Sequence, residues 1–174
     1  MKKFLLSIVF FYILSLAQTS FFASLISPNK LPNLILISVI LFIFFEKPRE
    51  NFSFFIAFLG GIFIDILSYN FFGITVIFLL ILTYLLKNII SSLKRVTVLW
   101  FSILSLGFLI IYNLFSEFIS YFFQSSFQEK SPPQFNYGTL LSFQLIYNFI
   151  LLLLIYYLLS FFKKYARSFF PKIS

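Results

Sequence analysis

Six long runs of apolar residues constrain the fold of this chain more than any other feature of its sequence. They extend over residues 4–26, 31–45, 48–69, 73–90, 96–123 and 139–162. A helix rises about 1.5 Å per residue, so roughly 20 apolar residues cross the ~30 Å hydrocarbon core of a bilayer. The second run is shorter, and Pro28 and Pro32 punctuate its start. We expect an all-α integral membrane protein, with six transmembrane helices forming one bundle and one domain over residues 1–174.

The amino-acid composition supports the membrane class and excludes several kinds of chemistry. The chain is 61% hydrophobic and only 10% charged, whereas soluble domains contain about 25% charged residues. It contains no Cys and no His, which excludes disulfides, thiol nucleophiles, Ser-His-Asp triads and most transition-metal sites. We therefore expect no cofactor and no metal site.

The basic residues predict how the chain lies in the membrane. With a cytoplasmic N-terminus and six spans, eleven of the thirteen bases lie on the inner side, and Lys30 and Lys130 lie outside. The inner set is Lys2, Lys3, Lys47, Arg49, Lys87, Lys94, Arg95, Lys163, Lys164, Arg167 and Lys172. Because lipid-facing proteins keep Lys and Arg on the cytoplasmic side, the net charge of +8 indicates topology and headgroup contacts, not a nucleic-acid partner. We expect both termini in the cytoplasm and residues 124–138 outside.

The first apolar run has some features of a secretory signal peptide. It follows Lys2 and Lys3, but it is longer than a usual signal-peptide core, and no clear A-x-A cleavage site follows it. We therefore expect it to be retained as the first membrane span.

A single aspartate lies within the third apolar run, in the sequence GGIFIDILS. Steps of four residues back from Asp65 reach Gly61, Ala57 and Ser53, all of them small, and Gly60 lies beside this ridge. Residues four apart share one face of a helix, and small residues on that face let another helix approach closely. We therefore expect Asp65 on the packed face of its helix, away from lipid.

Further polar residues are expected at the same depth, in the outer half of the membrane. With Asp65 they form a predicted intramembrane polar layer: Gln18, Asp65, Asn113, Glu117, Gln144 and Asn148. Three interpretations are open. The layer could be hydrogen-bonded and fix helix packing, or it could line a cavity for a small molecule or partner helix. It could also contain a catalytic or proton-carrying carboxylate pair, although no metal ligands or nucleophile accompany it.

Four motifs follow one another between Pro32 and Leu85. They are Pro32-Asn33-Leu34 before the short second run, Lys47-Pro48-Arg49 after it, Gly60-Gly61 with Asp65, and Gly73 before the fourth run. This ordered set resembles the rod-shape-determining protein MreD family over roughly a third of the chain. Two features depart from that pattern: Asn33 stands where Asp is common, and SYNFFG replaces a Gly-rich turn.

The resemblance implies a non-enzymatic component of the bacterial cell-elongation complex in the cytoplasmic (inner) membrane. Relatives in that family act with a bitopic MreC-like protein, and through it with an MreB-like cytoskeleton and a RodA–transpeptidase pair. The family is also similar to the substrate-binding subunits of energy-coupling-factor transporters. The expected function is therefore to maintain rod shape by scaffolding lateral peptidoglycan synthesis, and the alternative is a small-molecule-binding subunit of a membrane transporter.

Overall fold

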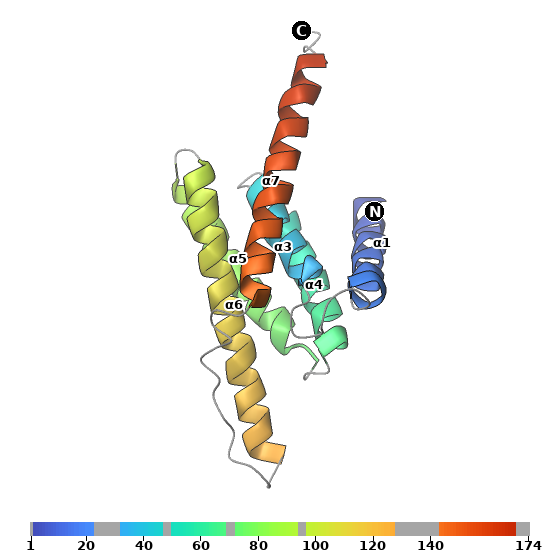
Figure 1. Cartoon of the computed structure of the whole chain (residues 1–174), viewed down its shortest axis with the longest axis vertical. Helices are drawn as coiled ribbons and strands as arrows, with labels where there is room; N and C mark the ends of the chain where they lie inside the picture. The colour runs from blue at the N-terminus through green and yellow to red at the C-terminus, as the bar shows by residue number, and fades with distance from the viewer. Residues whose placement is uncertain are drawn as a thin grey trace.

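The computed structural model describes residues 2–22, 32–46, 50–68, 72–93, 97–127 and 143–169, and the secondary structure in these ranges is entirely helical (Figure 1). The elements are α1 (Lys2–Leu16), the π-helix η1 (Ala17–Phe22), α3 (Leu34–Phe45), α4 (Phe52–Ser68), α5 (Ile74–Ser92), α6 (Val98–Phe127) and α7 (Phe143–Phe169). Each of the six predicted runs therefore contains one α-helix.

Three of these helices are long and apolar enough to cross a membrane. Their apolar segments are Ile74–Ser92, Val98–Phe122 and Gln144–Phe161. The other three apolar helices are shorter, at Phe4–Ser20, Leu34–Phe45 and Phe52–Ser68. In the first predicted run, α1 is followed directly by the π-helix η1, which begins at Ala17.

The core of the bundle is built around α3, the shortest of the α-helices. Most of its residues are buried, from Ile35 to Leu41 and again at Ile43. It packs against α1, α4, α5 and α7. A helix surrounded in this way has no polar face to present to water, which explains why its sequence is apolar on every side.

Two adjacent glycines bring α4 close to two different neighbours. A Cβ on Gly60 would lie 2.6 Å from Cγ2 of Val39 in α3, and a Cβ on Gly61 would lie 2.6 Å from Cα of Val76 in α5. Only residues without a side chain allow both approaches. The expected small-residue face of α4 is therefore where three helices meet, and Ser53, Ala57, Gly60, Gly61 and Asp65 are all buried in it.

The helices alternate in direction, so the bundle has two distinct ends (Figure 1). We call the end where α1 begins and α7 ends the termini end, and the opposite one the pocket end. In the view of Figure 1, α1 and α6 lie on opposite sides of α3 and α4. Stacked rings join α6 to its neighbours, with centroids 3.7 Å apart for Phe78 and Phe115 and 3.8 Å for Phe101 and Tyr156.

Candidate functional site

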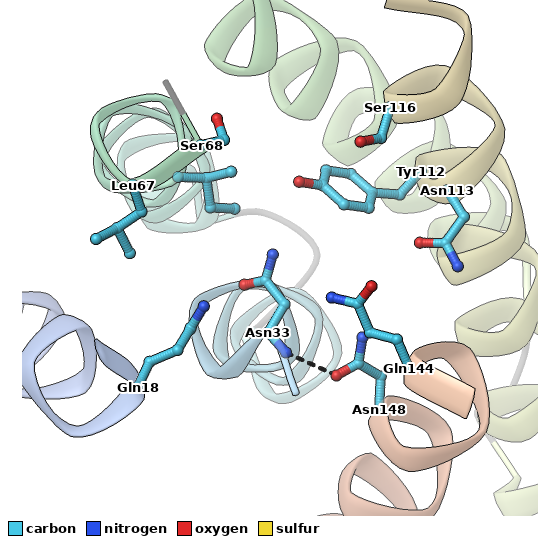
Figure 2. A pocket seen from close by; sticks show the side chains of 10 residues that line it. Gln18, Asn33, Leu67, Ser68, Tyr112, Asn113, Ser116, Gln144 and Asn148 are labelled. Carbon is cyan, nitrogen blue, oxygen red and sulfur yellow. Dashed lines mark hydrogen bonds between the residues drawn. The ribbon is translucent and has the colours of Figure 1, made fainter. Parts of the chain in front are cut away.

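A cavity of about 310 Å³ opens at the pocket end of the bundle (Figure 2). Its walls come from η1, the start of α3, the end of α4, the middle of α6 and the start of α7. The lining residues are Gln18, Asn33, Ile64, Leu67, Ser68, Tyr112, Asn113, Ser116, Gln144 and Asn148. Five carboxamides and three hydroxyls therefore face one space, and none of the lining side chains carries a formal charge.

Asn33, which precedes the first turn of α3, lines this cavity, and side-chain carboxamides cap that turn. The N–H of Leu36 donates to Asn33 Oδ1 at 3.0 Å, and the N–H of Leu34 donates to Gln18 Oε1 at 3.1 Å. The N–H of Asn33 donates to Asn148 Oδ1 at 2.8 Å. Helix N-termini leave their first N–H groups without intrahelical partners, and leaving them unpaired in a buried place is costly. Three separate elements therefore supply the cap that lets α3 begin inside the bundle.

Asp65 performs a similar task for α5. Its Oδ2 accepts from the N–H of Gly73 at 2.8 Å and its Oδ1 from the N–H of Thr75 at 3.2 Å, with only 2% of the residue exposed. Gly73 has φ of 100°, a left-handed conformation that glycine adopts without strain. The aspartate in GGIFIDILS is thus the cap of the next helix.

These contacts correct the partners expected for Asp65. The predicted partners were the amides and the carboxylate of the polar layer, at Asn113, Glu117, Gln144 and Asn148. The backbone of α5 takes both carboxylate oxygens instead, because the short connection from α4 to α5 places the start of α5 within reach.

The predicted polar layer divides into two groups in the structure. Four of its members, Gln18, Asn113, Gln144 and Asn148, line the cavity, whereas Asp65 and Glu117 are not among the lining residues. Sequence reasoning missed Tyr112, which precedes Asn113, and Ser68, which ends α4. Figure 2 shows the Tyr112 hydroxyl and the Asn33 amide nitrogen both pointing into the cavity.

The termini end holds a second polar cluster, which contains charges. Lys87 Nζ lies 2.8 Å from Glu46 Oε2, with side chains only 10% and 6% exposed respectively. Lys87 also donates to the carbonyl of Glu50 and lies 5.3 Å from the centre of the Phe54 ring. Lys87 was counted among the bases that indicate topology and contact headgroups, but it is a buried partner of Glu46.

Glu46 also joins α3 to α4. Both of its carboxylate oxygens accept from the N–H of Ser53 at 3.0 Å. Burial alone would raise the pKa of the Glu46 carboxyl, but hydrogen bonds from Lys87 and Ser53 and the positive charge of Lys87 outweigh burial and lower that pKa below 4.5. The carboxylate is therefore ionised at neutral pH and paired.

The other residues singled out in the sequence have varied positions. Pro32 is buried beside Asn33, and Gly73 precedes α5. Lys47, Pro48 and Arg49, together with Lys30 and Lys130, lie outside the described residues. Within the described ranges, no group of three or more Asp, Glu, His or Cys is placed to hold a metal ion.

Comparisons with known proteins add no further identification. No family model matches this sequence, and neither a curated protein nor a solved structure matches it.

Proposed function

We propose that this chain is a non-enzymatic component of the bacterial cell-elongation complex. In this proposal it crosses the cytoplasmic membrane six times with both termini inside, and it maintains rod shape by scaffolding lateral peptidoglycan synthesis through an MreC-like bitopic partner. An MreB-like cytoskeleton and a RodA–transpeptidase pair would be reached indirectly, through that partner.

One observation supports this proposal most. The residues that carry the resemblance to the MreD family include those that organise the core of the bundle. Gly60 and Gly61 bring α4 against α3 and α5, and Asp65 and Gly73 start α5. Residues with such tasks specify an architecture, so sharing them with a family favours sharing its fold and, with it, its role.

The surface of the bundle suits a protein that acts through contacts in the membrane. Many large apolar side chains remain exposed on α5, α6 and α7, such as Ile77, Leu99 and Leu154. In water such a surface would aggregate, but lipid tails or the span of a partner would cover it. The described structure has little polar surface outside the cavity and the helix ends for a soluble partner to use.

Depletion in a rod-shaped host, combined with affinity purification, tests the proposal. Depleted cells should lose their rod shape, the intact gene should restore it, and the tagged protein should copurify with the bitopic partner from solubilised membranes. Cells that keep their shape after depletion, together with a protein that captures no such partner, would contradict the scaffold function.

A second candidate function is favoured by the cavity itself. Its 310 Å³ volume lies at the lower end of the range for small-molecule sites, about 300–1,000 Å³. A wall with five carboxamides from four elements is suited to a polar ligand, so the chain would then be a small-molecule-binding subunit of a membrane transporter. Depleted cells that stay rod-shaped but lose uptake of one nutrient would favour this function over the scaffold.

A further inference from the structure

The three capping carboxamides at the pocket end have a fixed orientation. A backbone N–H can only donate, so the atom that faces it in Asn33, Gln18 and Asn148 must be the amide oxygen. The NH₂ group of each amide then lies on the other side of its carboxamide. The Asn33 amide nitrogen points into the cavity (Figure 2), so the start of α3 offers N–H donors to a ligand there.

We propose that this cavity binds a small uncharged ligand through the ligand's own oxygen acceptors, with carbonyl groups as the chemical class. The amide N–H groups of Asn33, Gln18 and Asn148 donate to those carbonyls. The inference deepens the second candidate function, and the scaffold function does not depend on it. The proposed site selects ligands that carry hydrogen-bond acceptors and no positive charge.

The charges around the cavity explain why the ligand should be neutral. None of the lining side chains is ionised or basic, so a buried anion would find no counter-charge there. A cation would meet the positive end of the α3 dipole and the N–H donors of the capping amides. Asp65 does not line the cavity, but its negative charge acts on Tyr112 in the cavity wall and so disfavours an anion further.

Two sources could supply such a carbonyl at this depth. One is the ester group of a membrane lipid, and the other is a water-soluble molecule that enters from the open end of the cavity. Both present the same acceptor chemistry to Asn33 and its neighbours. Lipids whose chains are ether-linked lack the ester carbonyl, so they separate the two sources.

A matched pair of probes tests the selectivity directly. N-methylpyrrolidone carries a carbonyl acceptor on a five-membered ring, and N,N-dimethylpyrrolidinium places a cation on the same ring. Saturation-transfer NMR would be recorded on the full chain in ether-lipid nanodiscs, with empty nanodiscs as the blank. We expect transfer to the pyrrolidone, at a Kd of about 1 mM for so small a ligand, and none to the cation.

Asn33→Asp sharpens this test. The new carboxylate still presents an oxygen to the Leu36 N–H and is favourable at a helix N-terminus, but it removes the N–H donors. Pyrrolidone binding should fall by about tenfold or more, the effect of losing one good hydrogen bond. The same change at Asn88, an exposed residue of α5, should leave binding unchanged.

Each other outcome overturns a defined part of the inference. Transfer to the cation alone would overturn the acceptor chemistry while leaving a ligand site in place. Transfer to neither probe, or transfer that Asn33→Asp does not reduce, would overturn the site itself, and the second candidate function with it. Repeating the measurement in ester-lipid nanodiscs assigns the source: a weaker pyrrolidone signal identifies lipid carbonyls as competitors, and an equal signal identifies a soluble ligand.

Discussion

At the termini end of the bundle a buried lysine neutralises a buried glutamate across 2.8 Å, whereas at the pocket end three neutral carboxamides cover the first turn of α3. At both ends, polar groups are buried among apolar helices and therefore need partners within the bundle. An ion pair satisfies itself and leaves no space between its partners. A carboxamide whose oxygen is occupied still has donors to offer, and beside these donors the structure leaves a cavity of about 310 Å³.

The termini end therefore serves the stability of the fold, whereas the pocket end serves both stability and a site. Lys87 and Glu46 contact each other, the Ser53 backbone and the carbonyl of Glu50, so the termini-end cluster acts as a clasp between α3, α4 and α5. The pocket-end amides hold α3 and also form the walls of a site. Substitutions at the two ends should therefore differ in size and in kind.

The largest effect is expected from Lys87→Met, which keeps most of the apolar stem and removes the charge. Glu46 would then be a buried carboxylate without its counter-charge, a change that costs about 3–5 kcal/mol of unfolding free energy. The double variant Glu46→Leu with Lys87→Met should recover most of this loss, since replacing a whole buried pair with apolar residues is often close to neutral. Reversible unfolding in mixed micelles measures both variants, and a single variant as stable as the wild type would show that the clasp is not needed.

A smaller loss is expected where α4 touches α5, between the two ends. Gly61→Ala places a Cβ 2.6 Å from Cα of Val76, a backbone atom that cannot rotate away. The helices must separate, at a cost of about 1–3 kcal/mol. Gly107→Ala is the matched control, because a Cβ there meets nothing within 4 Å and alanine is the better helix former. Equal stability for the two variants would contradict the close contact.

The next effect concerns the carboxylate of Asp65. Both of its oxygens accept from backbone N–H groups, so Asp65→Asn turns an NH₂ group toward one of these donors and leaves it unpaired. We expect a loss of about 1–3 kcal/mol, from one buried hydrogen bond that is not replaced. Glu117→Gln makes the same chemical change on α6, away from the cavity lining, and should have little effect. Unfolding midpoints that shift equally in the two proteins would show that Asp65 has no special capping role.

The smallest effect on stability is expected at the pocket end. Asn33→Ala removes one of three capping oxygens and should cost about 1 kcal/mol, the usual value of a helix N-cap. Asn33→Asp keeps that oxygen and should be as stable as the wild type. Thermal unfolding of the two variants in one detergent separates capping from binding, and a loss of stability in Asn33→Asp would mean that the amide nitrogen also supports the fold.

Much of the helical architecture could be predicted from the sequence. Apolar runs bounded by Pro, Gly and charges gave six helices in nearly the expected places, because burial in lipid or protein demands long unbroken hydrophobic segments. The four-residue spacing of Ser53, Ala57, Gly61 and Asp65 indicated which face of α4 is packed. Helical periodicity is local, so a single sequence reveals it.

The partners of the polar residues could not be predicted in the same way. Asp65 was expected to face amides on other helices, but which atoms it reaches depends on how the end of α4 lies against the start of α5. Lys87 was counted among the bases that indicate topology, although it lies inside an apolar helix and Glu46 directly follows another. Asn33 precedes an apolar run, a position that is typical of an N-cap, and this signal would have placed it at the start of α3.

The difference between the two ends is tested most directly by thiol labelling in intact cells, because the sequence contains no cysteine and each introduced one is unique. Ser68→Cys lies in the cavity wall at the pocket end, and Ser92→Cys lies exposed at the termini end. If the cavity is open to water on the outer side and both termini are cytoplasmic, a membrane-impermeant maleimide should label the cysteine at position 68 from outside. The cysteine at position 92 should react only after the membrane is permeabilised. Labelling of position 92 in intact cells, with position 68 unreactive, would contradict the account.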